Sequence, residues 1–338
     1  DGFHATVRAV TETLATTDHP HGSHINLLPG FVSPADLRYL KEICATWSPH
    51  PPVVAPGGSP GLEGSSGAPA PAGAGPIPAV LLPDYSDTLD GGQWDTYQEI
   101  PIGGTPVSAL KTMGQAKATI EFGLTIAPRH SAADFLEQKH GIPAYHLGLP
   151  IGVRQTDLFL AALEKITGTP PPAWLAGERG RLLDAYVDGH KHCFGQRAIV
   201  YGEEDLVVGI AAFLAEVGIL PVLLGSGGES GRFAEAAHAA VPNLAADTVI
   251  KEGVDFVQLS QLSADLHPDL VIGSSKGYPL ARDLRIPLVR TGFPIHDRLG
   301  GQRVLHLGYR GAMSLLDRIT DAILMRKQET SDVGYAYL

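Results

Sequence analysis

The strongest constraint on the fold of this chain is the repeated alternation of short, β-branched apolar runs with longer helical patterns. The apolar runs lie at 24–30, 78–84, 116–123, 197–202, 220–226, 247–251, 269–275 and 286–292. Such nearly continuous apolar runs are typical of strands that are buried on both faces of a parallel sheet. Because parallel neighbours are joined by crossover helices, the alternation predicts an α/β fold with parallel sheets.

Helix signals fall between these runs. Ser33 followed by Pro34 predicts an N-cap and a helix over about 34–47, because proline lacks an N–H that the first turn leaves unused. Further helices are expected over 203–217 and about 311–327. A helical stripe is already present at the start of the chain, in Phe3, Val7, Val10 and Leu14. Since the chain begins inside a helical pattern, we expect a fragment or a shortened reading frame.

The spacing of strands and helices divides the chain into two α/β blocks. We predict a Rossmann-like domain over 21–150, connecting helices over 151–194, a second Rossmann-like domain with a closing helix over 195–327, and a tail over 328–338. Residues 48–78 hold nine prolines and seven glycines and almost nothing to bury. We therefore predict that 48–78 is a disordered or loosely ordered surface insertion within the first domain.

Composition excludes several classes of function. The net charge of −11 argues against binding of nucleic acid or of an anionic membrane, because phosphate is met by Lys and Arg. No run of 18 apolar residues is present, so no membrane-spanning helix is expected. Two cysteines, Cys44 and Cys193, are too few for a disulfide framework or for a self-contained iron–sulfur or zinc site. We expect a protein of the reducing cytoplasm.

Four short motifs could bind a ligand, and each has a simpler explanation. The glycine-rich turns at 225–231 and 273–277 lack the spacing of a dinucleotide fingerprint and the ending of a phosphate loop, so we expect plain turns. The histidines of 19–24 are expected in a solvated linker, and HKHC at 190–193 in a helix end without a second ligand pair. No complete catalytic constellation is found, and we expect no catalytic residue.

Asp184 and Asp188 are the most suggestive pair. They stand four residues apart in a helical pattern, so both carboxylates project from one face. Like charges at this spacing repel by a few tenths of a kcal/mol, and a cation would relieve the repulsion. Two carboxylates are half of a metal site, and a solvated helix face remains the simpler interpretation.

Four stretches resemble the beta-type chain of the nitrogenase component-1 superfamily in order and spacing. They lie at 25–43, 101–123, 178–190 and 268–313. The last is the most specific, because RTGFPIHDR at a strand end is followed by GYRGAM at the start of a helix. The resemblance covers nearly the whole chain outside the Pro/Gly-rich insertion and implies tandem Rossmann-like domains of the component-1 type.

What the resemblance implies is one subunit of a heterotetrameric oxidoreductase. In such complexes an ATP-dependent iron protein passes electrons to an iron–sulfur P-cluster shared with an alpha-type subunit, which holds the reducing cofactor. The expected partners are therefore an alpha-type subunit, a second beta chain and the iron protein. The resemblance also implies that residues 1–20 are the end of a missing N-terminal domain that carries the cluster ligands, since neither cysteine of this chain falls at a ligand position.

The resemblance gives two groups of residues an expected role. Asp184 and Asp188 match an Asp-x-x-x-Asp pair that binds a divalent cation where two beta chains meet. A second group is expected in a loop at the carboxyl end of a parallel strand: Arg290, Phe293, Pro294, Asp297 and Arg298. This loop either shapes a subunit interface near the metal centres or is simply held by an Arg–Asp network, and we favour the second explanation.

Three functions remain open at this point. The preferred one is a beta-type subunit, or its C-terminal part, of a reductase acting on dinitrogen or on organic methylthio compounds. The second is the homologous chain of the cofactor-assembly scaffold, which the stretch LPDYSDTLDG at 82–91 favours. The third is a catalytically silent, truncated homologue. Cysteines encoded upstream would exclude the third.

Overall fold

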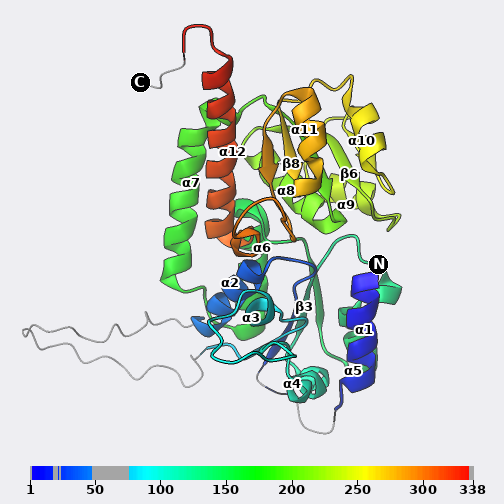
Figure 1. Cartoon of the computed structure of the whole chain (residues 1–338). Helices are drawn as coiled ribbons and strands as arrows, with labels where there is room; N and C mark the ends of the chain where they lie inside the picture. Colours follow the sequence, from blue (N-terminus) through cyan, green and yellow to red (C-terminus); the bar gives the residue numbers. More distant parts are fainter. Residues whose placement is uncertain (1, 18–21, 23, 48–75, 335–338) are drawn as a thin grey trace, which may run out of the picture.

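A computed structural model describes residues 2–17, 22, 24–47 and 76–334, which form two parallel sheets surrounded by helices. In the first sheet the strand order is β2 (Ala79–Leu81), β1 (Ile25–Leu28), β3 (Thr119–Phe122) and β4 (Ala144–Leu147). In the second it is β7 (Val249–Lys251), β6 (Leu220–Ser226), β5 (Arg197–Gly202), β8 (Leu270–Gly273) and β9 (Leu288–Arg290). Figure 1 shows the two sheets stacked, with the first sheet below the second.

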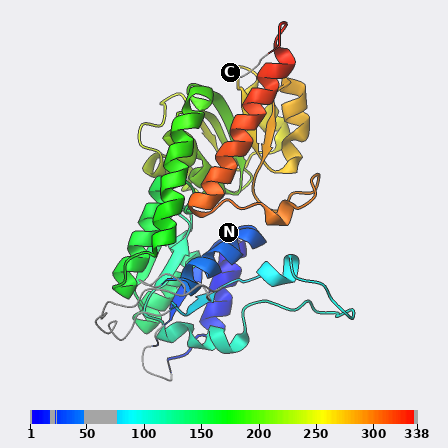
Figure 2. The ribbon, with the colours of Figure 1, turned by 90° about the vertical axis from the view of Figure 1, so that its left-hand side faces the viewer.

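The helices cover both faces of each sheet. They are α1 (Gly2–Leu14), α2 (Pro34–Ala45), α3 (Ser86–Leu89), α4 (Val107–Thr112), α5 (Ala132–His140), α6 (Gly152–Thr167), α7 (Ala173–Cys193), α8 (Glu204–Glu216), α9 (Phe233–Ala240), α10 (Phe256–Ser263), α11 (Tyr278–Leu284) and α12 (Gly308–Thr330). The two longest, α7 and α12, pack against each other along one side of the molecule (Figures 1 and 2). The chain is thus an α/β protein of parallel sheets with crossover helices, as the alternation of the sequence predicts.

Each strand divides its side chains between two cores, because successive residues point to opposite faces. In β1, Leu27 belongs to the large central core, whereas Leu28 faces a smaller core beneath α1, α4 and α5. In β5, Val200 enters the central core and Ile199 enters a third core on the far side of the second sheet. Most strands are largely apolar because both faces of the sheets are covered, which is why they stand out in the sequence.

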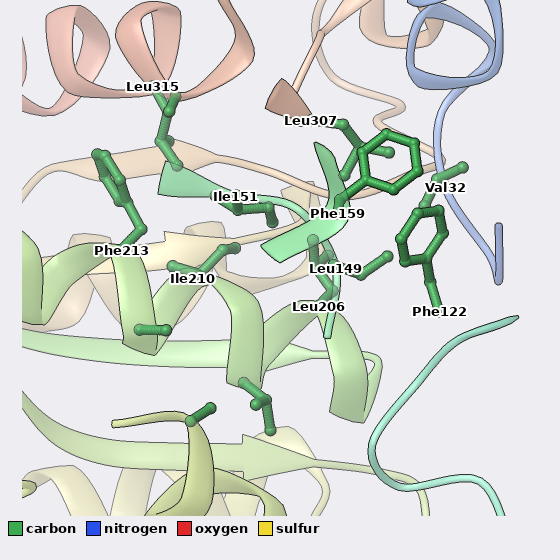
Figure 3. Packing of buried hydrophobic residues seen from close by; sticks show 14 of the residues in the cluster. Val32, Phe122, Leu149, Ile151, Phe159, Leu206, Ile210, Phe213, Leu307 and Leu315 are labelled. Carbon is green, nitrogen blue, oxygen red and sulfur yellow. The ribbon is translucent and has the colours of Figure 1, made fainter. Parts of the chain in front are cut away.

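The central core joins the two sheets. Figure 3 shows Val32, Phe122 and Phe159 from the first half of the molecule close to Leu206 of α8 and Leu307 before α12. Phe122 and Phe159 meet edge to face, with ring centroids 5.1 Å apart. Because one hydrophobic cluster contains side chains from both sheets, the two blocks pack as neighbours over a shared interior.

All eight apolar runs contain a strand, and one strand was not predicted. This strand, β4, has the sequence AYHL and lies at the edge of the first sheet, where its residues are half-buried or exposed. An edge strand needs no continuous apolar run, so its pattern is weak. The predicted helix ends are close to those observed: α12 begins three residues before the expected 311 and continues to Thr330, past the expected end at 327.

The predicted start of α2 is confirmed, and a glycine ends α6. Ser33 forms a capping box with Asp36 at the start of α2, and Pro34 is its first residue. Gly168 ends α6 in the left-handed conformation, φ +71°, and α7 begins after Pro172. Of the predicted insertion at 48–78, residues 48–75 lie outside the described part of the chain, as do 335–338 of the predicted tail. None of the described helices combines the length and apolar composition that a bilayer crossing requires.

Candidate functional site

The candidate site lies where loops that follow strands of both sheets meet. Asp205, just beyond β5, accepts hydrogen bonds from the backbone N–H groups of Leu124 (2.7 Å) and Thr125 (3.0 Å), just beyond β3. Phe31, beyond β1, packs against Phe293, beyond β9, with ring centroids 6.0 Å apart. These loops stand at the carboxyl ends of parallel strands, where α/β proteins place functional groups. We call this region the inter-sheet junction.

A buried Asp–His pair connects the two halves of the chain at the junction. Nδ1 of His306 lies 2.9 Å from Oδ2 of Asp36, and the two side chains are 2% and 1% exposed. The same carboxylate accepts hydrogen bonds from the backbone N–H groups of Ser33, His306 and Leu307. Nε2 of His306 accepts the N–H of Gly292 at 3.0 Å, so Nδ1 carries the proton and donates to Asp36.

The electrostatics of Asp36 follow from these contacts. Burial alone raises the pKa of a carboxyl group, because the charged form loses its hydration. The contact with His306 and the backbone N–H groups of His306 and Leu307 outweigh burial and hold the pKa of Asp36 below its usual value. Asp36 is therefore an ionised, fully bonded group that fixes the start of α2 against the start of α12.

A second group at the junction consists of His4 from α1 with Glu203 and Asp205 from the start of α8. One ring nitrogen of His4 and one carboxylate oxygen from each acid all lie within 4.8 Å of one another. Burial, and then the neighbouring Asp205, raise the pKa of Glu203 to about 7. Burial lowers the pKa of His4, although Asp205 and Glu121 oppose this effect. Sequence reasoning did not identify this group, and its one visible signal was the run of acids 203–205 directly after a strand.

The predicted loop residues at the end of β9 are held by ionic contacts. Nε of Arg290 lies 2.8 and 2.9 Å from the two carboxylate oxygens of Asp297 and donates to them. Nη1 of Arg298 donates to the backbone oxygen of Asp297 at 2.6 Å. The hydrogen bonds from Arg290 hold the pKa of Asp297 below its usual value. An Arg–Asp network thus closes this loop on itself.

The same loop reaches the first sheet through aromatic side chains. Phe293 stacks on Tyr85, beyond β2, with ring centroids 6.3 Å apart and an interplanar angle of 16°. The peptide bond between Phe293 and Pro294 is cis. The hydroxyl of Tyr85 donates to the backbone oxygen of Val32, so the aromatic contact is anchored on the α2 side of the junction. Phe293 therefore belongs to the packing between the two sheets, whereas Pro294 is exposed.

Asp184 and Asp188 lie on α7, and both are exposed. Within the described part of the chain, neither carboxylate forms a hydrogen bond or an ion pair. Asp188 lines a cavity of about 660 Å³ between α7 and α12, together with Asp317 and Asp321. Burial, and then Asp321, raise the pKa of Asp317. The structure thus adds two carboxylates from α12 to the neighbourhood of Asp188.

The glycine-rich turn after β6 is occupied by the protein's own carboxylates. The N–H of Ser230 donates to Glu204 at 3.1 Å. The N–H groups of Gly231 and Phe233 donate to Glu252 at 3.0 and 2.9 Å. Because amide donors that could meet a phosphate already have acceptors, this turn is structural. Most of the histidine motif at 19–24 lies outside the described residues.

The two cysteines do not fit an iron–sulfur cluster. Cys44 and Cys193 are both buried and free. Burial raises the pKa of Cys44 to about 12, and burial also raises the pKa of Cys193. A typical iron–sulfur cluster is held by four cysteines, and this chain has two. The sulfur of Cys193 instead lies 3.6 Å from the hydroxyl of Thr320 in α12.

Comparison with known proteins places this geometry in context. The family model described as "Nitrogenase component 1 type Oxidoreductase" matches residues 1–324. A nitrogenase molybdenum-iron protein beta chain of Methanococcus maripaludis is 31% identical over 336 residues, which are 98% of this chain and 66% of that protein. A nitrogenase iron-iron protein beta chain of Rhodobacter capsulatus is 32% identical over 325 residues, covering 95% of this chain and 64% of that protein.

A solved structure agrees with the sequence comparison. The structure titled "Nitrogenase Cp1 at pH 6.5" matches with a TM-score of 0.85 and 29% sequence identity, covering 100% of this chain and 68% of the matched chain. The chain therefore spans a little under two-thirds of the length of the curated relatives named above, 66% and 64%.

Proposed function

Since this chain belongs to the nitrogenase component 1 type oxidoreductases, we propose that it is a beta-type subunit, or part of one, of an ATP-dependent nitrogenase or nitrogenase-like reductase. In this role it supports electron transfer from an ATP-dependent iron protein, through an iron–sulfur cluster at the interface with an alpha-type subunit, to a cofactor in that subunit. The observation that carries the proposal is the similarity to beta chains over 98% of this chain. Similar identities to molybdenum-iron and iron-iron beta chains, 31% and 32%, leave the heterometal unassigned.

The contribution of these residues is that of a scaffold. This chain has two cysteines, whereas an iron–sulfur cluster is typically held by four, so we place the cluster's ligands elsewhere in the complex. What the chain supplies is a rigid pair of sheets whose loops are fixed at one junction by Asp36 and His306. A rigid scaffold suits electron transfer between bound centres, because it holds the distances between them constant.

We assign the exposed pair on α7 to contact with a second beta chain. Asp184 and Asp188 are exposed, and the cavity beside Asp188 is lined by the further carboxylates of Asp317 and Asp321 and by one lysine, Lys191, so negative charge predominates at this face. A divalent cation bound between two copies would relieve that charge, and Ca²⁺ or Mg²⁺ accepts carboxylate oxygens. Because a two-fold pairing places the same face twice at one interface, each copy needs to supply only part of the ligand set.

The loop after β9 is assigned to the surface that meets the alpha-type subunit. Its shape is fixed from within by Arg290 and Asp297 and from the first sheet by the stacking of Tyr85 on Phe293. Leu299, at the tip of the loop, is fully exposed at 100% of its reference area. Single exposed leucines are common on protein surfaces, so this assignment rests on the resemblance and on the position of the loop at the carboxyl ends of parallel strands.

The proposal is tested by reconstitution. The intact protein is expressed with an alpha-type subunit from the same gene neighbourhood, and reduction of dinitrogen and of organic methylthio compounds is measured with the iron protein and ATP. Turnover that requires the alpha-type subunit, the iron protein and ATP is the expected result, and replacement of ATP by ADP is the control.

Two other outcomes contradict the proposal. A complex that carries a transferable cofactor precursor but reduces no substrate identifies an assembly scaffold. A protein that purifies without an alpha-type partner and without iron identifies a catalytically silent homologue.

A further inference from the structure

The inference concerns His4, Glu203 and Asp205, which come together from distant parts of the chain. His4 stands in the first turn of α1, and the two acids stand at the start of α8, directly after β5. Figure 1 shows α1 beginning at the level where the two sheets meet. One ring nitrogen of His4 and one carboxylate oxygen from each acid all lie within 4.8 Å of one another. A single ion placed between them could therefore reach all three.

Both carboxylates are fixed in orientation by hydrogen bonds. Asp205 accepts the N–H groups of Leu124 and Thr125 and the hydroxyl of Thr125, the last at 2.8 Å. Glu203 accepts the N–H of Leu206 at 3.0 Å through Oε2. A carboxylate has about four positions at which it can accept a donor or a cation, so each acid keeps at least one position free. Ligands of metal ions are commonly oriented in this way by a surrounding layer of hydrogen bonds.

The charge balance at this place favours a cation. Asp205 is 5% exposed and Glu203 is half-buried. Within the described residues, no Lys or Arg forms an ion pair with either acid. The adjacent Glu204 is also buried and is directed to the turn at Ser230. Buried carboxylates without a counter-ion are costly, whereas the same group around a bound cation is stable.

We infer that His4, Glu203 and Asp205 form a binding site for a divalent transition-metal ion of the zinc type, which ties α1 to the start of α8. One imidazole nitrogen and two carboxylate oxygens match the ligand types and number of a three-ligand zinc site, in which water completes the coordination. Mg²⁺ and Ca²⁺ prefer sites built of oxygen atoms alone, so the imidazole selects against them. The ion links the first helix of the first sheet to the second sheet, so its removal loosens α1.

The test uses the intact protein in the assembly in which it purifies, stripped with a chelator and titrated with Zn²⁺ by calorimetry. The informative variants are His4→Gln and Glu203→Gln, because glutamine keeps a hydrogen-bonding group and spares the contacts of Asp205 with Leu124 and Thr125. His238→Gln on α9 is the matched control, since His238 is exposed and belongs to no such group.

The expected result is that the wild type and His238→Gln bind one more equivalent of zinc than His4→Gln does. In Glu203→Gln the affinity for that equivalent falls by about tenfold or more. Zinc raises the melting temperature of the wild type and of the control but not of His4→Gln, because the ion binds the folded state only.

Crystals of the zinc-loaded protein give a second, direct readout. An anomalous peak at the zinc edge bounded by His4, Glu203 and Asp205 is expected. Equal zinc stoichiometry in the wild type and in His4→Gln overturns the inference, as does a peak elsewhere with none at these residues. Displacement of the zinc by an equal concentration of Mg²⁺ contradicts the assignment to the zinc type. None of these measurements depends on reductase activity, so the zinc site and the proposed function are tested independently.

Discussion

Aspartate side chains have opposite environments at the inter-sheet junction and on the exposed face of α7. At the junction, Asp36 is 1% exposed and accepts hydrogen bonds from His306 and from three backbone N–H groups. On α7, Asp184 and Asp188 are exposed, and within the described part of the chain they have no bonding partner. The first arrangement is complete within one chain, whereas the second leaves both carboxylates exposed to solvent, where we propose that a cation binds.

This difference in burial and bonding separates residues that stabilise the fold from residues that are available for contact with a partner. A buried, fully bonded carboxylate stabilises the chain, because its partners would be left unsatisfied without it. An exposed, unbonded carboxylate contributes little to stability, so any effect of its loss is expected in binding and not in folding. Substitutions in the two regions should therefore change different measurements.

The largest effect is expected at Asp36. Asp36→Ala leaves one histidine N–H and three backbone N–H groups buried without an acceptor, and we expect the free energy of unfolding to fall by about 3 to 5 kcal/mol. The measurement is urea denaturation followed by circular dichroism. Asp184→Ala is the matched control, with an expected change below about 0.5 kcal/mol. An equal loss of unfolding free energy in the two variants would contradict the proposed difference between the junction and α7.

The pH dependence of stability sharpens the same comparison. The contacts of Asp36 outweigh its burial and depress its pKa in the folded state. A depressed carboxyl pKa contributes stability that is present above the unfolded pKa of about 3.9 and is lost as the pH falls through the folded value. The stability gap between the wild type and Asp36→Asn should therefore be constant from neutral pH to about pH 5 and should close in more acidic solution. A gap that widens on acidification would contradict this sign.

A smaller effect is expected at the loop that borders the junction. Arg290→Lys keeps the charge but loses the planar fork that binds both oxygens of Asp297, so the free energy of unfolding should fall by about 1 kcal/mol. Arg298→Lys is the control, because Arg298 is 60% exposed and donates to a backbone oxygen. If both variants lose the same stability, the Arg–Asp network does not hold this loop.

The smallest effect on stability, and the clearest effect on assembly, is expected on α7. The double variant Asp184→Asn with Asp188→Asn should unfold within about 0.5 kcal/mol of the wild type. Pairing of two beta chains should weaken, because the proposed cation loses its ligands. Oligomer size by light scattering and bound metal by mass spectrometry are the measurements. Unchanged size and metal content would remove the cation assignment.

The sequence predicted the parts of this fold that depend on local patterns. The strand Ile25–Leu28 lies in a largely apolar run, and the pair Ser33–Pro34 marks the start of α2, so both were visible without any structure. The strand Ala144–Leu147 was missed because an edge strand is half exposed and carries no such pattern. The chain's membership of its family was equally visible, in the stretch at 268–313.

The sites that depend on distant contacts could not be predicted in the same way. Asp36 and His306 are 270 residues apart, and each has an ordinary local context, the first as part of a capping box. His4 on α1 and Asp205 on α8 are about 200 residues apart in the sequence, and they meet where Asp205 also contacts the loop after β3. Periodicity describes one element at a time, so it contains no information on which loops of two sheets will meet.

The most direct test of the account is the iron content of this 338-residue polypeptide, expressed alone and purified without oxygen. We propose that these residues give shape and partner surfaces to a redox complex, while cluster ligation lies with other parts of that complex. We therefore expect a colourless protein with iron far below one atom per chain. A brown protein with stoichiometric iron and the absorption of an iron–sulfur cluster would contradict it.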